Sequence, residues 1–238
     1  IWNDPKSESG EPYGAANNDF EETLRIAKKV TDAGLGVLLN FHYSDFWADP
    51  GKQIKPKAWA DYNADELEKA VYDFTFECMS RAIAEGINVT MVQVGNEVTN
   101  GLLWPEGRVP NYDNIARFIS SGIRAVRKVN ALIPIMIHLD NGGNNELYRR
   151  WFDNYMRRGE DFDYIGMSYY PFWHGSLKML EDNMNDIAKR YHKDIIIAEV
   201  SMGYTMEDYK EYEKLEDHER KGYATRQELV DKIDYPMT

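Results

Sequence analysis

The sequence predicts an α/β fold, a (β/α)8 TIM barrel, of which this chain shows about six βα units and which is incomplete at both ends. Three observations favour it. Helical and strand-like segments alternate five times with short connections, which is typical of a parallel sheet. The strand-like segments are short, almost continuous apolar runs, as expected of strands covered on both faces. Nearly every one of them ends in a cluster of polar or aromatic residues.

The helices are predicted from apolar residues at helical spacing between a capping residue and a glycine or a polar stop. They are followed by β-branched or leucine-rich runs that predict strands. In chain order, the predicted elements are a helix over 19–33 and a strand over 36–41, a helix over 65–85 and a strand over 88–94, a helix over 111–130 and a strand over 134–139, a helix over 146–158 and a strand over 164–168, and a helix over 176–191 and a strand over 194–198.

The polar clusters separate a closed barrel from an open doubly wound sheet. A barrel collects functional residues from the carboxyl ends of many strands, whereas an open sheet concentrates them at one crevice. No Gly-x-Gly-x-x-Gly or Gly-x-x-x-x-Gly-Lys motif follows any predicted strand, so a nucleotide site has no support. Ile1-Trp-Asn3 resembles the tail of a sixth strand. We therefore expect residues 1–238 to form one catalytic barrel domain, truncated at its N- and C-termini.

Composition narrows the class of ligand. The chain has 238 residues, 43% of them hydrophobic, and a net charge of −12, which disfavours nucleic acid because phosphates would be repelled. Its longest apolar runs are far shorter than the roughly 18 residues of a membrane span. Six tryptophans and sixteen tyrosines favour a ligand with apolar faces and polar edges, such as a sugar.

Two acidic residues stand out because each follows a buried strand directly. Glu97 ends the run Gln93-Val-Gly-Asn-Glu97, and Glu199 ends Ile195-Ile-Ile-Ala-Glu199. Hydrolysis of a glycosidic bond needs one carboxylic acid to protonate the leaving oxygen and one carboxylate to attack the sugar or to activate water. The alternative is that each acid caps the helix that follows it. Asn96 beside Glu97 offers an amide to a sugar hydroxyl, and Tyr169 is positioned to orient Glu199.

Other residue patterns in the sequence give little support for a metal site or for a different kind of catalysis. The five histidines lack the spacing of a metal site, although His42, His138 and His174 each follow a strand, where they can bind hydroxyls. No serine lies in a Gly-x-Ser-x-Gly elbow. The single cysteine, Cys78, is expected to be a small buried hydrophobe. We expect no metal and no cofactor, and the acidic stretch 207–219 is interpreted as a solvated helix.

Several longer motifs resemble one family closely. They are Ile1-Trp-Asn-Asp-Pro5, the run His-Tyr-Ser-Asp-Phe-Trp-Ala-Asp-Pro over 42–50, Gln93-Val-Gly-Asn-Glu97 with Gly101-Leu-Leu-Trp-Pro105, His138-Leu-Asp-Asn141, and Ser168-Tyr-Tyr-Pro-Phe-Trp173. Together they are similar to arabinogalactan endo-β-1,4-galactanases, glycoside hydrolase family 53, in the large clan of retaining (β/α)8 enzymes. The resemblance covers nearly the whole chain.

The resemblance implies a role for each matching residue. Glu97 is similar to the acid/base after the fourth barrel strand, and Glu199 to the nucleophile after the seventh. The substrate-binding residues implied are Asn96, Tyr169, His42, Asp45, Trp47, His138, Asp140, Trp173, Trp2 and Asn3. For the tryptophans, Trp104 included, core packing is the alternative. Several bacterial members of the family hold calcium in a loop after the seventh strand, but the matching residues, 204–210, do not resemble that loop.

The expected function is retaining endo-hydrolysis of β-1,4-galactan, the side chains of pectic arabinogalactan, by two glutamates. Two alternatives stay open: another endo-β-glycanase of the same clan acting on mannan or glucan, and a non-catalytic polysaccharide-binding barrel. We expect a polysaccharide as the partner, no nucleic acid and no membrane span, and a full-length enzyme that is a monomer. Since polymeric pectin does not enter cells, we expect a secreted or cell-surface bacterial protein. The segment by itself is expected to aggregate through its open sheet edges.

Overall fold

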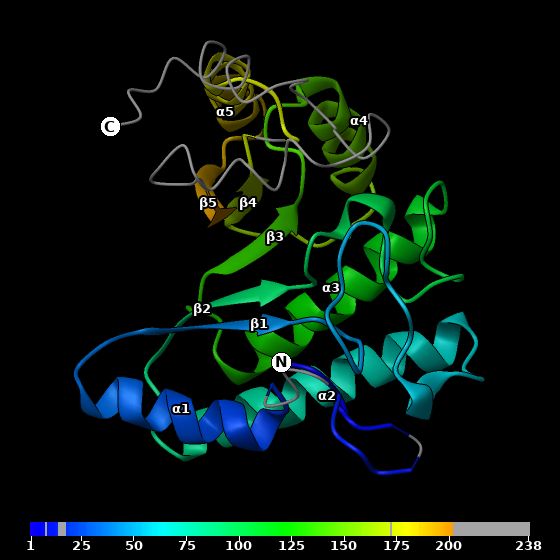
Figure 1. Ribbon diagram of the computed structural model, residues 1–238, viewed down its shortest axis with the longest axis vertical. Coiled ribbons are helices and arrows are strands. Elements are labelled where there is room, and N and C mark those ends of the chain that lie inside the picture. The colour runs from blue at the N-terminus through cyan, green and yellow to red at the C-terminus, as the bar shows by residue number, and fades with distance from the viewer. Residues whose placement is uncertain (8, 14–17, 172, 202–238) are drawn as a thin grey trace, which may run out of the picture. The chain divides into compact units, whose positions relative to one another are not determined.

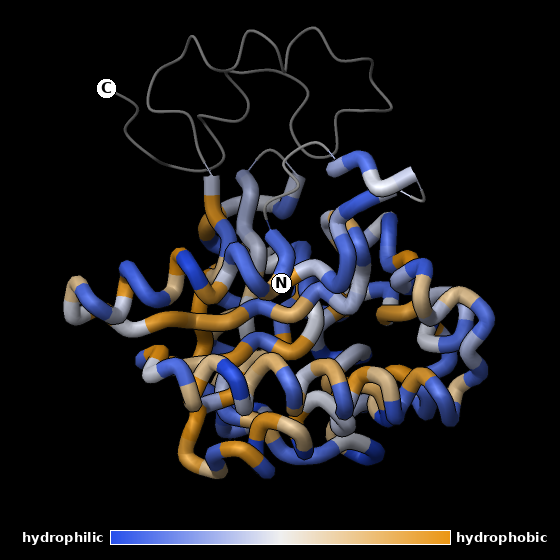
Figure 2. The backbone as a smooth tube through the Cα atoms, turned by 90° about the horizontal axis from the view of Figure 1, so that it is seen from below, coloured by the Kyte–Doolittle hydropathy of each residue, from blue (hydrophilic) through white to orange (hydrophobic). Residues whose placement is uncertain are grey.

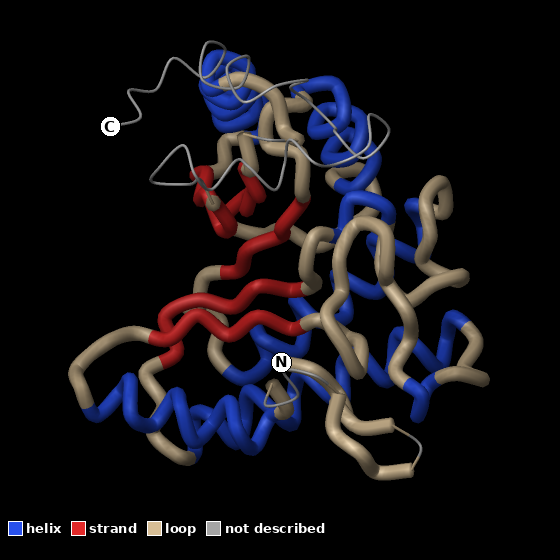
Figure 3. The backbone as a smooth tube through the Cα atoms, viewed as in Figure 1, coloured by secondary structure: helices blue, strands red, loops and turns tan. Residues whose placement is uncertain are grey.

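The computed structural model describes residues 1–7, 9–13, 18–171 and 173–201. Helices and strands alternate along the chain (Figures 1 and 3). In order they are α1 (Phe20–Asp32), β1 (Val37–Phe41), η1 (Lys57–Trp59), α2 (Ala64–Ala84), β2 (Val89–Val94), η2 (Val98–Asn100), α3 (Tyr112–Val129), β3 (Ile135–Leu139), α4 (Asn145–Tyr155), β4 (Tyr164–Tyr169), α5 (Leu177–Tyr191) and β5 (Asp194–Val200). The predicted helices and strands are all confirmed, with ends that differ by at most three residues.

The strands form one sheet in the order β1-β2-β3-β4-β5. β1 pairs with β2 and β2 with β3, both in parallel. Beside them, the Asp163 N–H donates to Ile135 O at 2.9 Å, and the Gly142 N–H donates to Ser168 O at 2.9 Å. A parallel sheet in which strand order equals chain order, with a helix between neighbours, is half of a (β/α)8 barrel.

The first residues of the chain continue this pairing. The amine of Ile1 donates to Asn40 O, and the His42 N–H donates to Ile1 O at 3.0 Å, which is how a residue on a parallel strand binds the two neighbours of its partner. Asn3 N–H then donates to Ser44 O at 2.8 Å. The expectation that Ile1-Trp-Asn3 ends a further strand agrees with these bonds.

The contacts of the chain divide into two compact units, described separately below. The first comprises Ile1–His138 and Asp153–Tyr164, and the second comprises Leu139–Phe152 and the described residues from Ile165 on. The expectation of one domain stays a prediction.

In the first unit the helices form where capping and an apolar stripe coincide. The Asp19 carboxylate accepts from the Glu22 N–H at the start of α1, and Asn63 and Glu66 make a reciprocal capping box at the start of α2. Polar and apolar residues alternate along the helices (Figure 2), as expected of helices with one covered face. α2 packs on α3, and α3 packs on β2.

One glycine fixes how closely α3 approaches the sheet. A methyl group on Gly122 would lie 2.6 Å from the Tyr43 hydroxyl and 2.8 Å from Val94 Cγ1. Tyr43 is buried, and its hydroxyl lies 2.8 Å from Thr75 Oγ1 on α2. The hydroxyl therefore has little room to move away.

In the second unit α4 and α5 are joined by polar contacts. Arg149 on α4 pairs with Asp186 on α5, and Asn145 donates to the same carboxylate at 2.8 Å. The hydrogen bonds from Arg149 and Asn145 lower the pKa of Asp186 to about 2. The buried Asn183 on α5 donates to Gly142 O, which fixes the turn after β3 against this helix.

Among the described residues, no helix is both long and apolar enough to cross a membrane. The acidic stretch 207–219 and the calcium-loop comparison at 204–210 lie outside the described residues. Cys78 is buried, which confirms its interpretation as a small buried hydrophobe, and burial raises the pKa of its thiol to about 12.

Candidate active site

The loop after β2 holds Glu97 in an uncommon conformation. Gly95 has φ +83°, and a side chain there would collide with Val98, 2.6 Å away. Glu97 itself is left-handed, with φ 46° and ψ 51°. A non-glycine residue in this region costs of order 1 kcal/mol and is enriched at functional sites. The turn brings a glutamate that is only 6% exposed to the carboxyl end of the sheet.

The Asn96 side chain is fixed by hydrogen bonds to two side-chain amides and one backbone carbonyl. Its Oδ1 accepts from Asn40 Nδ2 at 2.9 Å and from Gln93 Nε2 at 3.0 Å, and its own Nδ2 donates to Ala48 O at 2.8 Å. Gln53, from the loop after β1, donates to Asn96 O at 2.8 Å and to Glu97 O at 3.3 Å. Because Ala48 O can only accept, the orientation of the Asn96 amide is fixed.

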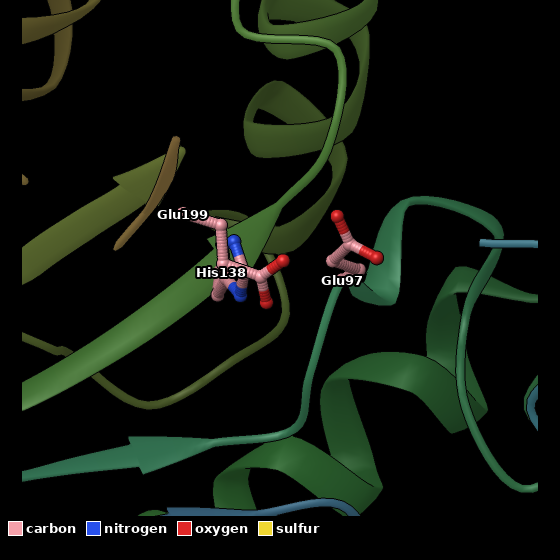
Figure 4. A group of neighbouring side chains, drawn as sticks. All are labelled: Glu97, His138 and Glu199. Atoms are coloured by element: carbon pink, nitrogen blue, oxygen red, sulfur yellow. The ribbon is translucent and has the colours of Figure 1, made fainter. Parts of the chain in front are cut away.

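His138, at the end of β3, is fully buried, and Figure 4 draws it together with Glu97. Its Nδ1 lies 3.1 Å from Gln93 Nε2. One of its ring nitrogens lies within 4.8 Å of a carboxylate oxygen of Glu97. Burial lowers the pKa of His138 to about 3, so the ring is neutral at any ordinary working pH.

His42 is built into the loop after β1. Its Nδ1 accepts from the Ala48 N–H at 3.1 Å, and burial, with a smaller effect of nearby positive charge, lowers its pKa well below the usual range. Edge-on aromatic contacts tie it to Trp2 and Trp47. His42 therefore joins the loop that carries Trp47 to the network around Asn96.

The tryptophans differ in what they can offer to a ligand. Trp2 is 2% exposed and packs against Phe46 at 5.1 Å, so little of its ring is open to a ligand, and its predicted role in substrate binding stays a prediction. Trp47 is 49% exposed and Trp173 is 44% exposed; each has ring surface open to solvent. The ring of Trp104 is covered by the Arg108 guanidinium, 4.4 Å from its centroid.

The Asp45 carboxylate binds backbone groups of the protein rather than facing open solvent. Asp45 accepts from the Asp4 N–H at 2.9 Å through one oxygen and from the Lys57 N–H at 2.8 Å through the other. These bonds hold two loops together, a role the sequence did not predict. Within the described residues, the buried Oδ1 of Asn3 and that of Asn40 have no hydrogen-bond partner, and such an atom is costly unless a ligand or water satisfies it.

The second unit carries Glu199 on β5 (Figure 4). The Tyr170 hydroxyl donates to Glu199 Oε2 at 2.8 Å. The predicted orienting residue was its neighbour, Tyr169, whose hydroxyl donates instead to Gly175 O at 2.9 Å. Successive residues at the end of a strand point in opposite directions, and this explains why the two phenols have different partners. Tyr170 thus contacts Glu199 directly, while the predicted role of Tyr169 in orienting Glu199 stays a prediction.

The same unit contains Asp140, which is 7% exposed and accepts from the Asn141 amide. It also contains Trp173, whose ring lies 5.8 Å from that of Tyr170. Trp173 and His174 line a cavity of about 570 Å³ together with Asn141, Asn144 and Asp182. An exposed indole among amides and carboxylates suits a sugar ring.

Some residues of the network were not predicted. Gln93 and Asn40 are polar residues within apolar strands, Gln53 lies in the loop after β1, and Gln93 is 3% exposed. A buried amide inside the run Val89–Val94 breaks the apolar pattern of a covered strand, and that break was the available signal.

Comparison with known proteins decides the family. The family model described as glycosyl hydrolase family 53 matches residues 1–231. The chain belongs to glycosyl hydrolase family 53. The predicted resemblance is confirmed.

Named relatives agree with the family match. An endo-beta-1,4-galactanase of Bacillus subtilis is 38% identical over 208 residues, covering 87% of this chain and 48% of the relative. An arabinogalactan endo-beta-1,4-galactanase of Humicola insolens is 37% identical over 193 residues, covering 78% of this chain and 58% of the relative. The chain thus spans about half the length of these family 53 relatives.

Solved structures give the same picture. The family 53 catalytic domain from Ignisphaera aggregans matches with a TM-score of 0.85 and 37% identity, over 100% of this chain and 63% of that one. A fungal beta-1,4-galactanase matches with a TM-score of 0.78 and 34% identity, over 86% and 61%. A xylanase from Cellvibrio japonicus, at 13% identity and a TM-score of 0.61 over 84% and 43%, shares the fold alone. The TIM-barrel architecture predicted from the sequence is the (β/α)8 fold of these enzymes, here seen in part.

Proposed function

We propose that the protein is a retaining endo-hydrolase of β-1,4-galactan. The observation that carries this proposal is the family 53 match over residues 1–231, with relatives named as β-1,4-galactanases. The residues assigned to the mechanism lie where the sequence predicted them along the chain: Asn96 and Glu97 follow β2, and Glu199 lies on β5.

In this proposal the two glutamates act in turn. Glu97 protonates the glycosidic oxygen as the bond to it breaks, while Glu199 attacks the anomeric carbon and forms a covalent galactosyl ester. Glu97, now a carboxylate, then removes a proton from water as the water attacks the same carbon and releases Glu199. Retention requires carboxyl groups about 5–5.5 Å apart.

The surrounding polar residues position the sugar. Asn96 retains an N–H of Nδ2 beyond the one donated to Ala48 O, and we assign it to the 2-hydroxyl of the sugar under attack. His42, His138 and Asp140 are assigned to further hydroxyls, and the sequence predicts the same for Asn3, Asp45 and Tyr169. For Asp45, the bonds to Asp4 and Lys57 favour a supporting role.

Exposed aromatic rings are suited to the flat faces of galactose. Trp47 and Trp173, each about half exposed, are assigned to stacking on sugar units. A polymeric substrate outside the cell makes secretion or surface attachment the expected location. We further propose that the reaction needs neither metal nor cofactor and that the full-length enzyme acts as a monomer.

The substrate is tested with these 238 residues together with whatever sequence flanks them in the gene. Galactan, mannan and cellulose are offered side by side. Release of short β-1,4-linked galactose oligomers from galactan only is expected, and the anomer first formed, followed by proton NMR, should be β. Cleavage of mannan or glucan only would contradict the substrate assignment, and a first-formed α product would contradict the double displacement.

Two substitutions separate an enzyme from a binding barrel. Glu97→Gln and Glu199→Gln keep the size of each side chain but remove the proton donor or the nucleophile, and losses of kcat of roughly 10³-fold or more are expected. Azide, an alternative nucleophile, should accelerate Glu97→Gln on substrates with good leaving groups. It should not accelerate the wild type or restore cleavage by Glu199→Gln. Unchanged turnover in both variants would favour the non-catalytic barrel.

A further inference from the structure

The Gln93 side chain lies where β2 turns into the loop that carries Asn96 and Glu97. Its Nε2 is 3.0 Å from Gly95 O, 3.0 Å from Asn96 Oδ1 and 3.1 Å from Nδ1 of His138. Both Gln93 and His138 are buried. One amide group therefore joins the backbone of the glutamate turn, the Asn96 side chain and the histidine at the end of β3.

The orientation of this amide is determined by its neighbours. Gly95 O can only accept a hydrogen bond, so the Gln93 atom that faces it is the nitrogen. Asn96 Oδ1 requires the same, because the Asn96 Nδ2 is already committed to Ala48 O. A reversed amide would bring two carbonyl oxygens against Gln93 Oε1, which is unfavourable.

The orientation of the amide in turn determines the tautomer of the histidine. An amide nitrogen has hydrogens to donate and no lone pair to accept with. The two hydrogens of the Gln93 amide face three acceptors, so one hydrogen is shared. A proton on Nδ1 of His138 would point at a nitrogen that cannot accept it. Nδ1 is therefore the unprotonated nitrogen, and in a neutral ring the proton is on Nε2. The burial of the ring keeps it neutral.

We infer that Gln93 is a positioning residue that holds His138 as its Nε2–H tautomer, so that the end of β3 carries a neutral N–H donor. A neutral donor can bind a sugar hydroxyl or a carboxylate without adding a positive charge to the site. This use of the donor rests on the proposed function, whereas the tautomer follows from the contacts of Gln93 alone.

A purely structural role for Gln93 would need only its bond to Gly95 O, which supports the turn. Gln93→Met keeps the length and much of the volume of the side chain but removes the donor. Gln53→Met is the matched control. Gln53 is also buried, and its amide also supports the Asn96–Glu97 backbone, but it donates to backbone carbonyls rather than to His138.

The tautomer is read directly by ¹⁵N NMR of the ¹⁵N-histidine-labelled full-length protein, assigned with His138→Gln. We expect the wild-type and Gln53→Met spectra to show a protonated Nε2 and an unprotonated Nδ1 for His138. In Gln93→Met the two nitrogens should move toward the opposite or a mixed tautomer. A proton on Nδ1 in the wild type, or an unchanged tautomer in Gln93→Met, would overturn the inference.

Kinetics on galactan test what the tautomer does. Gln93→Met should lower kcat by roughly 10- to 100-fold, because the loss of one oriented donor at a reacting centre costs this much or more, with a smaller change in KM. A wild-type kcat alongside a changed tautomer would show that Gln93 has no positioning role in turnover. A wild type that has the expected tautomer but cleaves no glycan would refute the proposed function and leave the tautomer assignment intact.

Discussion

The Tyr170 phenol donates a 2.8 Å hydrogen bond to Oε2 of Glu199. Tyr170 lies directly after β4 and Glu199 lies on β5, so the bond joins the ends of two successive strands. A hydrogen bond from a phenol to a carboxylate is a strong, charge-assisted contact that restricts the rotamer of the acid. The orientation of the proposed nucleophile therefore depends on a residue of the preceding strand.

Replacement of Tyr170 by phenylalanine should reduce activity on galactan. Without the hydroxyl, Glu199 loses one constraint on its attack geometry, and we expect kcat to fall by roughly 10-fold or more, since small misplacements at a reacting centre cost 10- to 100-fold. Tyr169→Phe is the comparison, because its hydroxyl bonds to Gly175 O. If Tyr169→Phe lowers kcat and Tyr170→Phe does not, then Tyr169, as first predicted, is the residue that matters.

Acid should destabilise the first unit through its buried histidines. The folded pKa of His138 is about 3, against an ordinary value of 6.5, so the unfolded chain binds a proton first as the pH falls. The stability is complete above about pH 7 and declines from there toward pH 3. Between pH 7 and pH 5 this one histidine should reduce the free energy of unfolding by about 2 kcal/mol.

Urea unfolding at pH 7 and pH 5 measures this effect. His138→Gln should be less stable than the wild type at pH 7 but should lose less stability on going to pH 5. His192→Asn is the control, because His192 is exposed, and it should keep the wild-type difference. An equal pH effect in His138→Gln and wild type would mean that His138 is not held neutral by burial.

Gly122→Ala should destabilise the fold although it lies inside a helix. Helix propensity alone favours alanine over glycine by about 1 kcal/mol. Here the added methyl group would press on Tyr43 and Val94, and overpacking of a buried contact costs about 1–3 kcal/mol. Thermal unfolding should show a lower Tm for Gly122→Ala, while Lys128→Ala on the exposed side of α3 should change it little. A raised Tm in Gly122→Ala would show that α3 shifts away from the sheet without cost.

Asp45 gives a test between support and substrate binding. Its carboxylate accepts from two backbone N–H groups, those of Asp4 and Lys57. Asp45→Ala should therefore lower the free energy of unfolding by about 2 kcal/mol or more, because buried donors lose their partner. Asp49→Ala, which removes only a local bond to the Gly51 N–H, should have a smaller effect. A raised KM with unchanged stability would instead assign Asp45 to the substrate.

The order of elements could be predicted because each element has a local signal. Asn63 with Glu66 marks the start of α2, and the apolar run before Phe41 marks β1. The positions of Glu97 and Glu199 at strand ends follow from the same pattern. These features depend on neighbours in sequence, which is why they were correct within a few residues.

The side-chain network could not be predicted in the same way. Whether Tyr169 or Tyr170 meets Glu199 depends on the strand register, and a shift of one residue reverses the face. The contact between Gln93 and His138 joins residues 45 positions apart. Asp45 was predicted to bind substrate, and its bonds to the Asp4 and Lys57 backbones are contacts between loops that the sequence did not indicate. Such contacts depend on how segments far apart in the sequence come together in the fold, and a local motif does not determine this.

The left-handed backbone at Glu97 has a practical consequence for trapping a bound oligosaccharide. Asparagine and glycine adopt this conformation more readily than glutamate, so exchanging the acid for either one removes the proton donor while easing the local backbone. Glu97→Asn should thus give an inert form that withstands heat as well as its parent, suited to long soaks with intact galactan fragments.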